Sequence, residues 1–425
     1  MASFFIPLTG LEADSTALNT IANDLANMNT TAFKSQAVDF SDLFYQQIGS
    51  AGSGDPIQVG AGVQVGSIAT AFTQGSISAT GNATDVALNG GGFFIVNNNG
   101  VNEYTRAGNF SMDTNGALIT SNGLSVMGYP AVAGVVNTNS PLTPITIPVG
   151  QVQTPQATTT LNMITNLDAT SANGAAFPSQ ITIYDSLGVS HVATVTYTKT
   201  GVNTWSYSVA LPATDFTSGV STPVTGSMTF SSSGDLISVA QGAGAAVPVG
   251  TGAGQIAQVP LAFNGLSDGA ADLAMNWNLL GTGGTPTVSQ VAAGSAVSST
   301  TQDGYTSGNY QSFSIAANGT VTATYSNGQQ QAVGQLALAN ISNLQGLQFL
   351  GNGDYATTLA SGTASIGTSG TNGLGTLQDG ALEQSNVNIS AEFSQLIIAQ
   401  RAFEANSKTV TTFDTVTQDT INMIH

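Results

Sequence analysis

The sequence predicts an α+β fold, mainly β, in which long helices from the two ends of the chain pair with each other. Apolar residues recur at helical spacing in residues 1–34 and 385–425. The chain between them is rich in Gly, Ser, Thr and Asn, and it has the pattern of short strands separated by turns. Terminal helices can pair only if the intervening chain folds out and back. We therefore expect two nested β domains, discontinuous or inserted, between them.

The N-terminal helix is predicted from a row of apolar residues at heptad spacing with polar residues between them. Thr9 and Glu12 fit a capping box, which would start the helix at Thr9; a start at Ser3 is the alternative. The row fits either the core of one domain or a helix–helix seam, and its single heptad phase favours the seam. Its members are Leu11, Leu18, Ile21, Leu25 and Met28.

The C-terminal helix is expected to start near Ser390, a suitable N-cap residue, with Glu392 in its first turn. Polar residues interrupt its apolar stripe, so it is a poor standalone coiled coil. It is a better fit to a packed helical array, in which the protein's own body or other copies satisfy the polar groups. The predicted seam residues of this helix are Phe393, Leu396, Phe403, Val410 and Phe413.

The segment 35–71 is predicted to link the helical ends to the β domains. Phe40, Phe44 and Ile48 suggest a short helix, and the alternation from Val59 to Ile68 suggests a strand. Beyond it, Asn-Gly pairs indicate tight hairpin turns. They include Asn89-Gly90, Asn99-Gly100, Asn115-Gly116, Asn122-Gly123, Asn318-Gly319 and Asn327-Gly328.

Two changes in composition mark the domain boundaries. Prolines concentrate in residues 140–160, and residues 284–304 are almost uncharged and rich in Ser, Thr, Ala and Gly. We therefore predict an inserted β domain and an outer β domain whose two halves flank it in sequence. The predicted domains are 1–34 plus 385–425 (helical), 35–71 (linking), 72–146 plus 301–375 (outer β domain) and 147–300 (inserted).

The composition excludes several classes of function. Lys and Arg number 5 against 23 Asp and Glu, for a net charge of −18. So few cations cannot form a nucleic-acid footprint or bind an anionic membrane surface. No stretch approaches the roughly 20 apolar residues of a membrane span, and the first residues lack the features of a cleaved signal peptide. We expect no nucleic-acid partner and no membrane insertion.

The residues needed for catalysis or metal binding are scarce. The chain has no cysteine and two histidines, His191 and His425, far apart in sequence. This gives no zinc-ligand spacing, and we expect His191 at a surface position of a strand. There is neither a nucleophile-elbow motif nor a phosphate-binding loop with its lysine. The sequence predicts no enzyme activity, no catalytic residue, no cofactor and no metal.

Both terminal segments resemble signature motifs of the axial proteins of the bacterial flagellum, the family of rod, hook and hook-associated subunits. Residues 23–34 (NDLANMNTTAFK) resemble the motif NNxANxxTxGFK, and residues 399–408 (AQRAFEANSK) resemble AQRAYxANSK. Asp24 replaces the usual Asn, and Ala32 replaces Gly, which makes a left-handed turn there less favourable. The motif residues are Asn23, Leu25, Ala26, Asn27, Thr30, Phe33, Lys34, Gln400, Arg401, Ala405 and Asn406.

Within that family, the large insertion at 147–300 favours a hook-type subunit over a distal rod subunit. The resemblance implies a helical homopolymer, a curved flexible tube that transmits motor torque from rod to filament. It also implies a location in the extracellular hook, attached to the basal body, and export without a cleaved signal peptide. The implied partners are further copies of the chain, the distal rod, hook cap and hook–filament junction proteins, and the flagellar export apparatus.

The alternatives are a distal rod subunit and, from another class, a secreted adhesive or carbohydrate-binding β protein. The middle of the chain, rich in Ser, Thr, Gly and Asn, suits the latter. Such a protein would not need heptad-like helices at both ends, and that feature separates the two classes.

Overall fold

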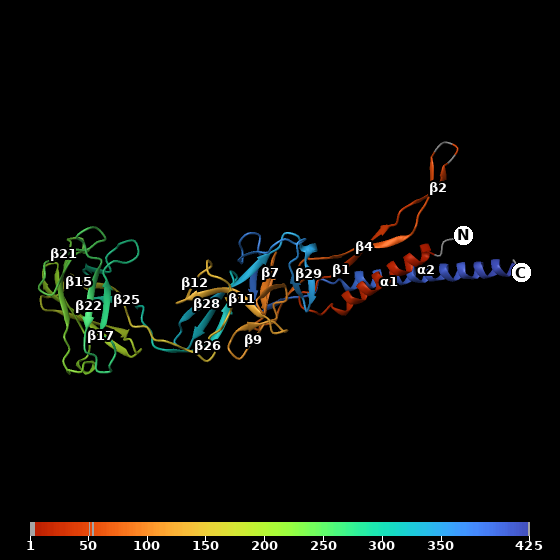
Figure 1. Ribbon diagram of the computed structural model, residues 1–425. Coiled ribbons are helices and arrows are strands. Elements are labelled where there is room, and N and C mark those ends of the chain that lie inside the picture. Colours follow the sequence, from red (N-terminus) through yellow and green to blue (C-terminus); the bar gives the residue numbers. More distant parts are fainter. Residues whose placement is uncertain (1–4, 51, 53–54, 424–425) are drawn as a thin grey trace. The chain divides into compact units, whose positions relative to one another are not determined.

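The computed structural model describes residues 5–50, 52 and 55–423. As predicted, most of the regular structure is β, and the long helices lie near the two ends of the chain (Figure 1). The chain forms two compact units. Unit 1 contains residues up to 149, 312–324 and 330 onward, and unit 2 contains 150–311 and 325–329. The domain boundaries proposed from the sequence remain predictions.

Unit 1 contains the helices α1 (Phe5–Ala26) and α2 (Ile389–Met423), which lie side by side (Figure 1). The predicted start at Thr9 is wrong, because α1 already includes Phe5 and the Thr9 hydroxyl donates to Ile6 O at 2.8 Å inside the helix. Ser3, the alternative start, lies outside the described residues. Asn388, not Ser390, caps α2: its Oδ1 accepts the backbone N–H groups of Ser390 and Ala391.

The described residues of the linking segment form two antiparallel strand pairs and no helix. In the first, β1 (Gln36–Asp42) pairs antiparallel with β4 (Val63–Thr70), and in the second β2 (Gln46–Ser50) pairs with β3 (Pro56–Val59). The helix predicted around Phe40–Ile48 is therefore wrong, and the predicted strand from Val59 to Ile68 is divided between β3 and β4. A short apolar run does not by itself distinguish helix from strand, and here cross-strand pairing decides.

A large sheet forms the β part of unit 1, with a core that includes Phe93, Ile95, Tyr104 and Tyr355. Asn99 and Gly100 both have positive φ, 50° and 93°, and form the predicted two-residue turn between β7 and β8. The strands in sheet order are β27 (Thr320–Tyr325), β28 (Gln330–Asn340), β11 (Ser125–Val132), β7 (Phe93–Asn98), β8 (Val101–Thr105), β30 (Asp354–Ala356) and β29 (Gln348–Gly351).

Short strands complete this unit and join chain segments from both sides of the insertion. β5 (Ile77–Ala79) pairs with β33 (Ala381–Glu383), and β6 (Val86–Asn89) pairs with β32 (Thr376–Asp379). The remaining elements are β9 (Ser111–Met112), β10 (Leu118–Ile119), β12 (Val135–Val136), β13 (Thr143–Pro144), β31 (Ser365–Thr368) and the 3₁₀ turn η2 (Leu344–Gly346).

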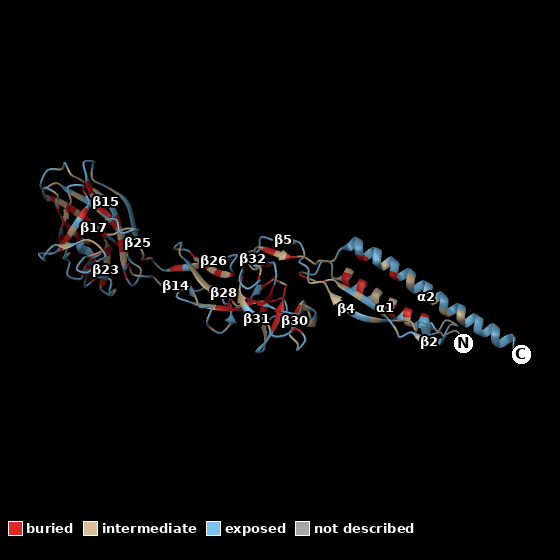
Figure 2. Cartoon of the chain, turned by 90° about the horizontal axis from the view of Figure 1, so that it is seen from above, coloured by how far each residue is buried: buried red, intermediate tan, exposed pale blue. Residues whose placement is uncertain are grey.

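Unit 2 contains two sheets that share one core, seen as alternating buried and exposed residues in Figure 2. One is formed by β16 (Ala176–Tyr184), β17 (Ser190–Gly201), β18 (Thr204–Ala210), β19 (Val224–Phe230), β20 (Leu236–Gln241) and β21 (Val247–Pro248). The other is formed by β22 (Gln258–Phe263), β23 (Leu273–Asn278), β15 (Thr160–Asp168), β24 (Val288–Val291) and β25 (Ala296–Gln302).

Two further elements complete unit 2. The 3₁₀ turn η1 (Ala213–Asp215) follows β18, and β14 (Val152–Gln153) pairs with the first residues of β26 (Gly308–Ile315). The prediction of a surface position for His191 is wrong. This residue of β17 is only 5% exposed, because carboxylates from neighbouring loops cover its ring. His425 lies outside the described residues. No helix among the described residues is long and apolar enough to cross a membrane.

Trp277 lies at the centre of the unit 2 core, fully buried, with its ring 6.1 Å from that of Tyr197 and 5.6 Å from that of Tyr207. Within the described part of the chain, its Nε1 has no hydrogen-bond partner. We expect Trp277→Ala to lower the free energy of unfolding of unit 2 by about 3–5 kcal/mol. Trp277→Phe should cost less, because it keeps an aromatic ring and loses no hydrogen bond. Urea unfolding followed by the fluorescence of Trp205 measures both; equal losses would contradict this account.

Candidate assembly site

The two terminal helices contact each other through small and polar side chains. A Cβ placed on Gly10 would come within 2.7 Å of the Asn406 side-chain amide, so a larger residue at this position would displace that amide. Asn406 in turn donates from Nδ2 to Asp14 Oδ2 at 2.8 Å. Ala13 on α1 and Ala399 on α2 are buried beside this contact. The helix pair of one chain is thus close, narrow and partly polar.

The predicted apolar seam lies beside this contact row. Of its α1 members, Ile21 is buried, Leu11, Leu18 and Leu25 are half-buried, and Met28, beyond the end of the helix, is exposed. On α2, Leu396, Val410 and Phe413 are half-buried, whereas Phe393 and Phe403 are 52% and 38% exposed. Their role as a seam stays a prediction.

Sequence reasoning missed a row of buried and half-buried small or polar residues on α1 and α2. On α1 it follows 3/4 spacing with small or polar residues, and on α2 it follows a spacing of seven. The regular spacing of these residues could have indicated the row. The neighbouring leucine row has the same kind of spacing and is more apolar, so the sequence favours it as the contact surface instead. The missed residues are Gly10, Ala13, Ala17, Thr20, Asp24, Glu392 and Ala399.

Most of α2 is exposed (Figure 2), and its exposed residues include several large apolar ones. Ile397 and Ile398 are 58% and 68% exposed, and Phe5 and Leu8 of α1 are each 56% exposed. Soluble monomers rarely leave contiguous apolar surface of this kind uncovered. The same helix carries Arg401 and Lys408, both exposed, and Arg401 pairs with Glu404 at 3.1 Å.

Two carboxylates are buried where α1 and α2 approach the β part of the unit. Asp24 Oδ2 accepts the Gln36 backbone N–H at 2.7 Å, while among the described residues Asp24 Oδ1 and Glu392 Oε2 have no partner. Burial raises the pKa of Asp24 to about 6; the Gln36 hydrogen bond opposes this and the charge of Glu392 adds to it. Burial also raises the pKa of Glu392.

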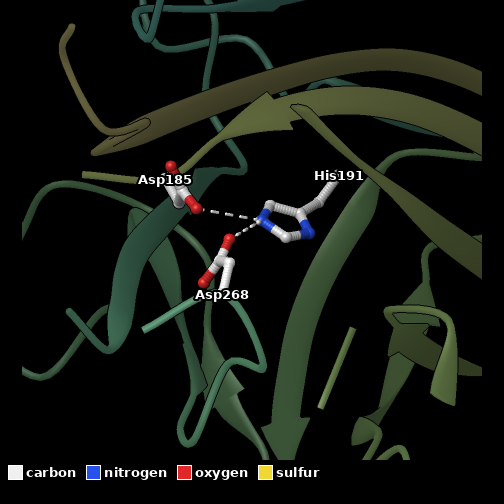
Figure 3. Close-up of side chains that lie close together, drawn as sticks. All are labelled: Asp185, His191 and Asp268. Atoms are coloured by element: carbon white, nitrogen blue, oxygen red, sulfur yellow. Dashed lines mark hydrogen bonds and ion pairs between the residues drawn. The ribbon is translucent and has the colours of Figure 1, made fainter. Parts of the chain in front are cut away.

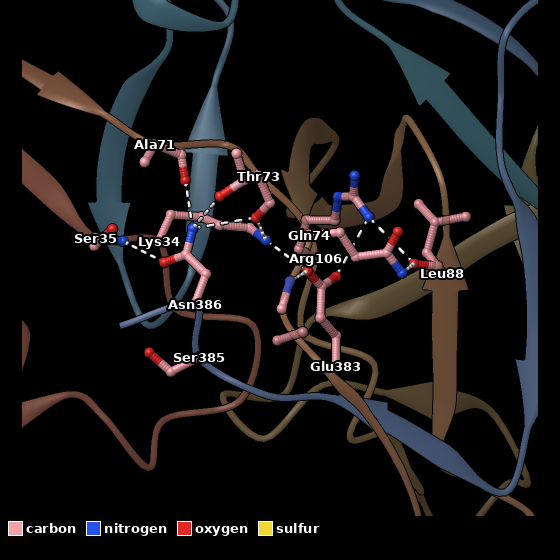
Figure 4. A network of polar contacts seen from close by, with 12 residues as sticks. Lys34, Ser35, Ala71, Thr73, Gln74, Leu88, Arg106, Glu383, Ser385 and Asn386 are labelled. Carbon is pink, nitrogen blue, oxygen red and sulfur yellow. Dashed lines mark hydrogen bonds and ion pairs between the residues drawn. The ribbon is translucent and has the colours of Figure 1, made fainter. Parts of the chain in front are cut away.

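A buried ionic network holds both ends of the chain to the β part of unit 1 (Figure 4). Glu383 Oε1 lies 2.6 Å from Lys34 Nζ, and Oε2 lies 3.3 Å from Arg106 Nη1. Lys34 also donates to Thr73 O at 2.9 Å, and Arg106 Nη2 donates to Gly90 O at 2.6 Å. Burial lowers the pKa of Lys34 and of Arg106, while Glu383 opposes that shift in each.

Asn386 extends this network to the backbone. Its Oδ1 accepts Ser35 N–H at 2.7 Å, and its Nδ2 donates to Ala71 O at 2.7 Å. Ala32, with a left-handed φ of 55°, turns the chain after α1 so that its N–H donates to Glu383 O at 2.8 Å. We call Lys34, Arg106, Glu383 and Asn386 the basal clamp. Its members come from segments far apart in sequence.

The motif residues divide between structural and exposed positions. Lys34 belongs to the basal clamp, Thr30 donates to Asn27 Oδ1 at 3.0 Å, and Asn27 Nδ2 donates to Asn23 O at 2.9 Å. Among the others, Leu25 and Phe33 are half-buried, and Ala26, Gln400, Arg401 and Ala405 are exposed. Sequence reasoning named neither Arg106 nor Glu383 as a site residue, because no local pattern connects them to Lys34.

Four family models match the chain. They are the flagella basal body rod protein (residues 8–34), the hook protein FlgE/F/G D1 domain (87–166), the flagellar basal body protein FlaE D2 domain (150–305) and the rod FlgEFG protein C-terminal region (378–423). Similar proteins include the flagellar hook protein FlgE of Treponema pallidum, 34% identical over 100% of this chain and 99% of that protein. The flagellar hook protein FlgE of Escherichia coli is 34% identical over 99% of this chain and 100% of that protein.

A solved structure has the same fold. The flagellar hook protein FlgE2 of Helicobacter pylori matches 71% of this chain and 99% of its own, with a TM-score of 0.53 and 15% sequence identity. At this identity the match concerns the fold alone.

The basal clamp gives a prediction about stability. Glu383→Ala leaves Lys34 and Arg106 buried without a counter-charge, which should cost about 3–5 kcal/mol in the free energy of unfolding of unit 1. The matched control is Glu404→Ala, which breaks an exposed pair and should change stability little. Thermal unfolding followed by circular dichroism compares them. Similar losses in the two variants would contradict the clamp.

Asp24 gives a prediction about pH. Its pKa is about 6 in the folded chain, above the ordinary value of 3.8, so the folded state holds a proton that the unfolded state releases. This contribution to stability is complete below pH 3.8 and is lost as pH rises through 6. Relative to Asp24→Asn, the wild-type helical end should therefore weaken from about pH 4 to 6 and then level off. Urea unfolding followed by helical ellipticity at several pH values measures the difference; a difference independent of pH contradicts it.

Proposed function

The chain belongs to the flagellar hook protein family, and from this premise we propose that its copies polymerise through α1 and α2 into a curved, flexible tube. The chain is a structural subunit of the hook, in a family that is not a family of enzymes. The tube would transmit torque from the rod to the filament. The exposed apolar surface of α2 is the observation that supports this mode of assembly.

The geometry of α2 supports assembly through this surface. The face toward α1 carries Glu392, Ala399 and Asn406, and it is already used within one chain. Phe393 and Ile397 lie on the opposite face, 52% and 58% exposed, because they are displaced around the helix from that row. Burying such side chains against another copy contributes about 1.5–3 kcal/mol each. Packing against several copies would also cover the half-buried leucine row of α1.

The inserted domain suits lateral contacts that rearrange as the tube bends. Lys199 is the only Lys or Arg within 147–300, and its Nζ donates to Ala169 O inside the same unit. No cation of this domain is therefore available for strong ion pairs with a neighbouring copy. Polar, uncharged contacts can slide without breaking such pairs. The separate core of unit 2 lets it keep its fold during the movement.

We further propose the partners and location that follow from a hook subunit. The tube would join the distal rod below, carry the hook cap during growth and meet the hook–filament junction proteins above. Subunits would pass through the flagellar export apparatus without a cleaved signal peptide. A role as a distal rod subunit is less well supported than a role in the hook, because unit 2 is an additional domain with a hydrophobic core of its own. An adhesive or carbohydrate-binding protein would leave the helical ends unexplained.

The assembly surface can be tested by charge substitution. Phe393→Asp with Ile397→Asp should abolish tubes in electron micrographs of concentrated protein, because two charges would have to be buried between copies. The helix itself should persist, since both positions are exposed in the single chain.

The matched control is Val202→Asp with Val220→Asp, which makes the same change at positions of unit 2 that are 88% and 63% exposed. This variant should still form tubes. If the variant with Phe393→Asp and Ile397→Asp forms tubes and sediments like the wild-type protein, assembly through this face is contradicted. A loss of helical ellipticity in its monomer would assign the defect to folding instead, and Phe393→Ser with Ile397→Ser then repeats the test without charge.

A further inference from the structure

One end of unit 2 gathers three carboxylates around a buried imidazole. Asp185 follows β16, His191 belongs to β17, Asp215 ends η1, and Asp268 lies in the loop between β22 and β23. The ring of His191 is covered, with 6% of its side chain exposed, and the Asp185 side chain is fully buried. Figure 3 shows Asp185 and Asp268 on the same side of the ring. The proposed assembly through α1 and α2 does not use this cluster.

Each carboxylate is fixed through one oxygen and directs the other to the ring. Asp185 Oδ1 accepts the N–H groups of Leu187 at 2.9 Å and Val189 at 2.8 Å. Asp268 Oδ1 accepts the Ala270 N–H at 3.0 Å. In all three residues it is Oδ2 that faces His191. The local turns therefore position these oxygens before any ligand arrives.

The two sides of the imidazole differ in a way that points to a metal. Nδ1 lies 2.9 Å from Asp215 Oδ2, an ordinary hydrogen-bond distance. Nε2 lies 3.3 Å from Asp185 Oδ2 and 3.6 Å from Asp268 Oδ2, longer than a charge-assisted hydrogen bond. A tetrahedral ion with bonds of about 2.0–2.1 Å separates its ligand atoms by roughly 3.3–3.4 Å. The distance from Nε2 to Asp185 Oδ2 matches that separation, and the distance to Asp268 Oδ2 is slightly longer.

We propose that Asp185, His191 and Asp268 bind a divalent transition-metal cation of the zinc class. Nε2 and the two Oδ2 atoms, all within 4.8 Å of one another, would supply three ligands, and water would supply the fourth. Asp215 would hold the Nδ1–H, which leaves the Nε2 lone pair free for the metal, as carboxylates commonly do for metal-binding histidines.

Charge and access agree with this assignment. Two carboxylates balance a divalent cation, and the Asp268 side chain is 23% exposed, so an ion and its water can enter from that side.

A bound ion would connect the two sheets of unit 2. Asp185 and His191 belong to the β16–β17 hairpin of one sheet, and Asp268 belongs to the β22–β23 connection of the other. The ion would therefore stabilise the packing of the sheets against each other. It would act independently of assembly through α1 and α2.

The test uses the full chain after removal of metals by EDTA and dialysis. Titration with ZnCl₂ should give one site per chain, and Zn²⁺ at about a hundredfold excess over Kd should raise the unfolding temperature of unit 2 by about 5–10 °C. Co²⁺ should give the visible absorption of a tetrahedral centre. His191→Ala and Asp268→Asn should each lose the site, and His425→Gln, which removes the only other histidine, should keep it.

The partly exposed Asp268 keeps the proposal testable if His191→Ala fails to fold. Loss of the Zn²⁺-dependent rise in Asp268→Asn, with the circular dichroism of the metal-free protein unchanged, supports the site. Absence of Zn²⁺ binding to the wild-type chain overturns it. So does a folded Asp268→Asn chain that binds with wild-type affinity.

Discussion

The buried charge of Glu383 is the constraint on which the helical end of unit 1 depends. Lys34 follows α1 by a few residues, and Glu383 precedes α2 by a few, so their ion pair fixes both helices at their bases. Arg106 attaches the same carboxylate to the sheet. Buried charges are costly unless paired and hydrogen-bonded, and here donors from Gly75 and acceptors at Thr73 and Gly90 complete the set. The helices can therefore extend from a defined base.

This use of charge explains an unusual feature of the composition. The chain has 5 cationic side chains, and Lys34, Arg106 and Lys199 are buried. Within the described residues, that leaves Arg401 and Lys408, both on α2, as the exposed ones. Elsewhere the charged side chains on the described surface are acidic. The cations are thus placed either in buried contacts within the fold or on α2, the helix that also exposes apolar side chains.

The sequence predicts the architecture well and the details of contact poorly. Asn99-Gly100 gives its turn from local chemistry, and the terminal helices follow from their periodicity. The α1–α2 contact cannot be predicted in this way. Gly10 and Ala13 are important because their small size lets the helices approach closely, and this becomes visible only once the partner helix is known. The apolar spacing around Phe40 and Ile48 fits a helix and a strand equally well. The pairing of β1 with β4 and of β2 with β3 makes both residues part of strands.

The partners of the site residues are even harder to predict from the sequence. Lys34 could be predicted from the resemblance, but its partner Glu383 is 349 residues away and carries no local signal. The burial of His191 could not be predicted either, since a polar residue in an alternating strand is normally exposed. Its surroundings come from loops that only the tertiary fold brings together.

The strand pairs β5–β33 and β6–β32 have a consequence for the order of folding. They pair Ala79 with Ala381 and Leu88 with Leu377, so each pairing closes a loop that contains more than half of the chain. Unit 2 instead closes on itself, with hairpins such as β16–β17 between neighbours in sequence. Because long loops are slow to close, unit 2 should fold first, and unit 1 should wait for both of its halves. A chain delivered as a thread would then carry a folded middle before its ends become competent to join another copy.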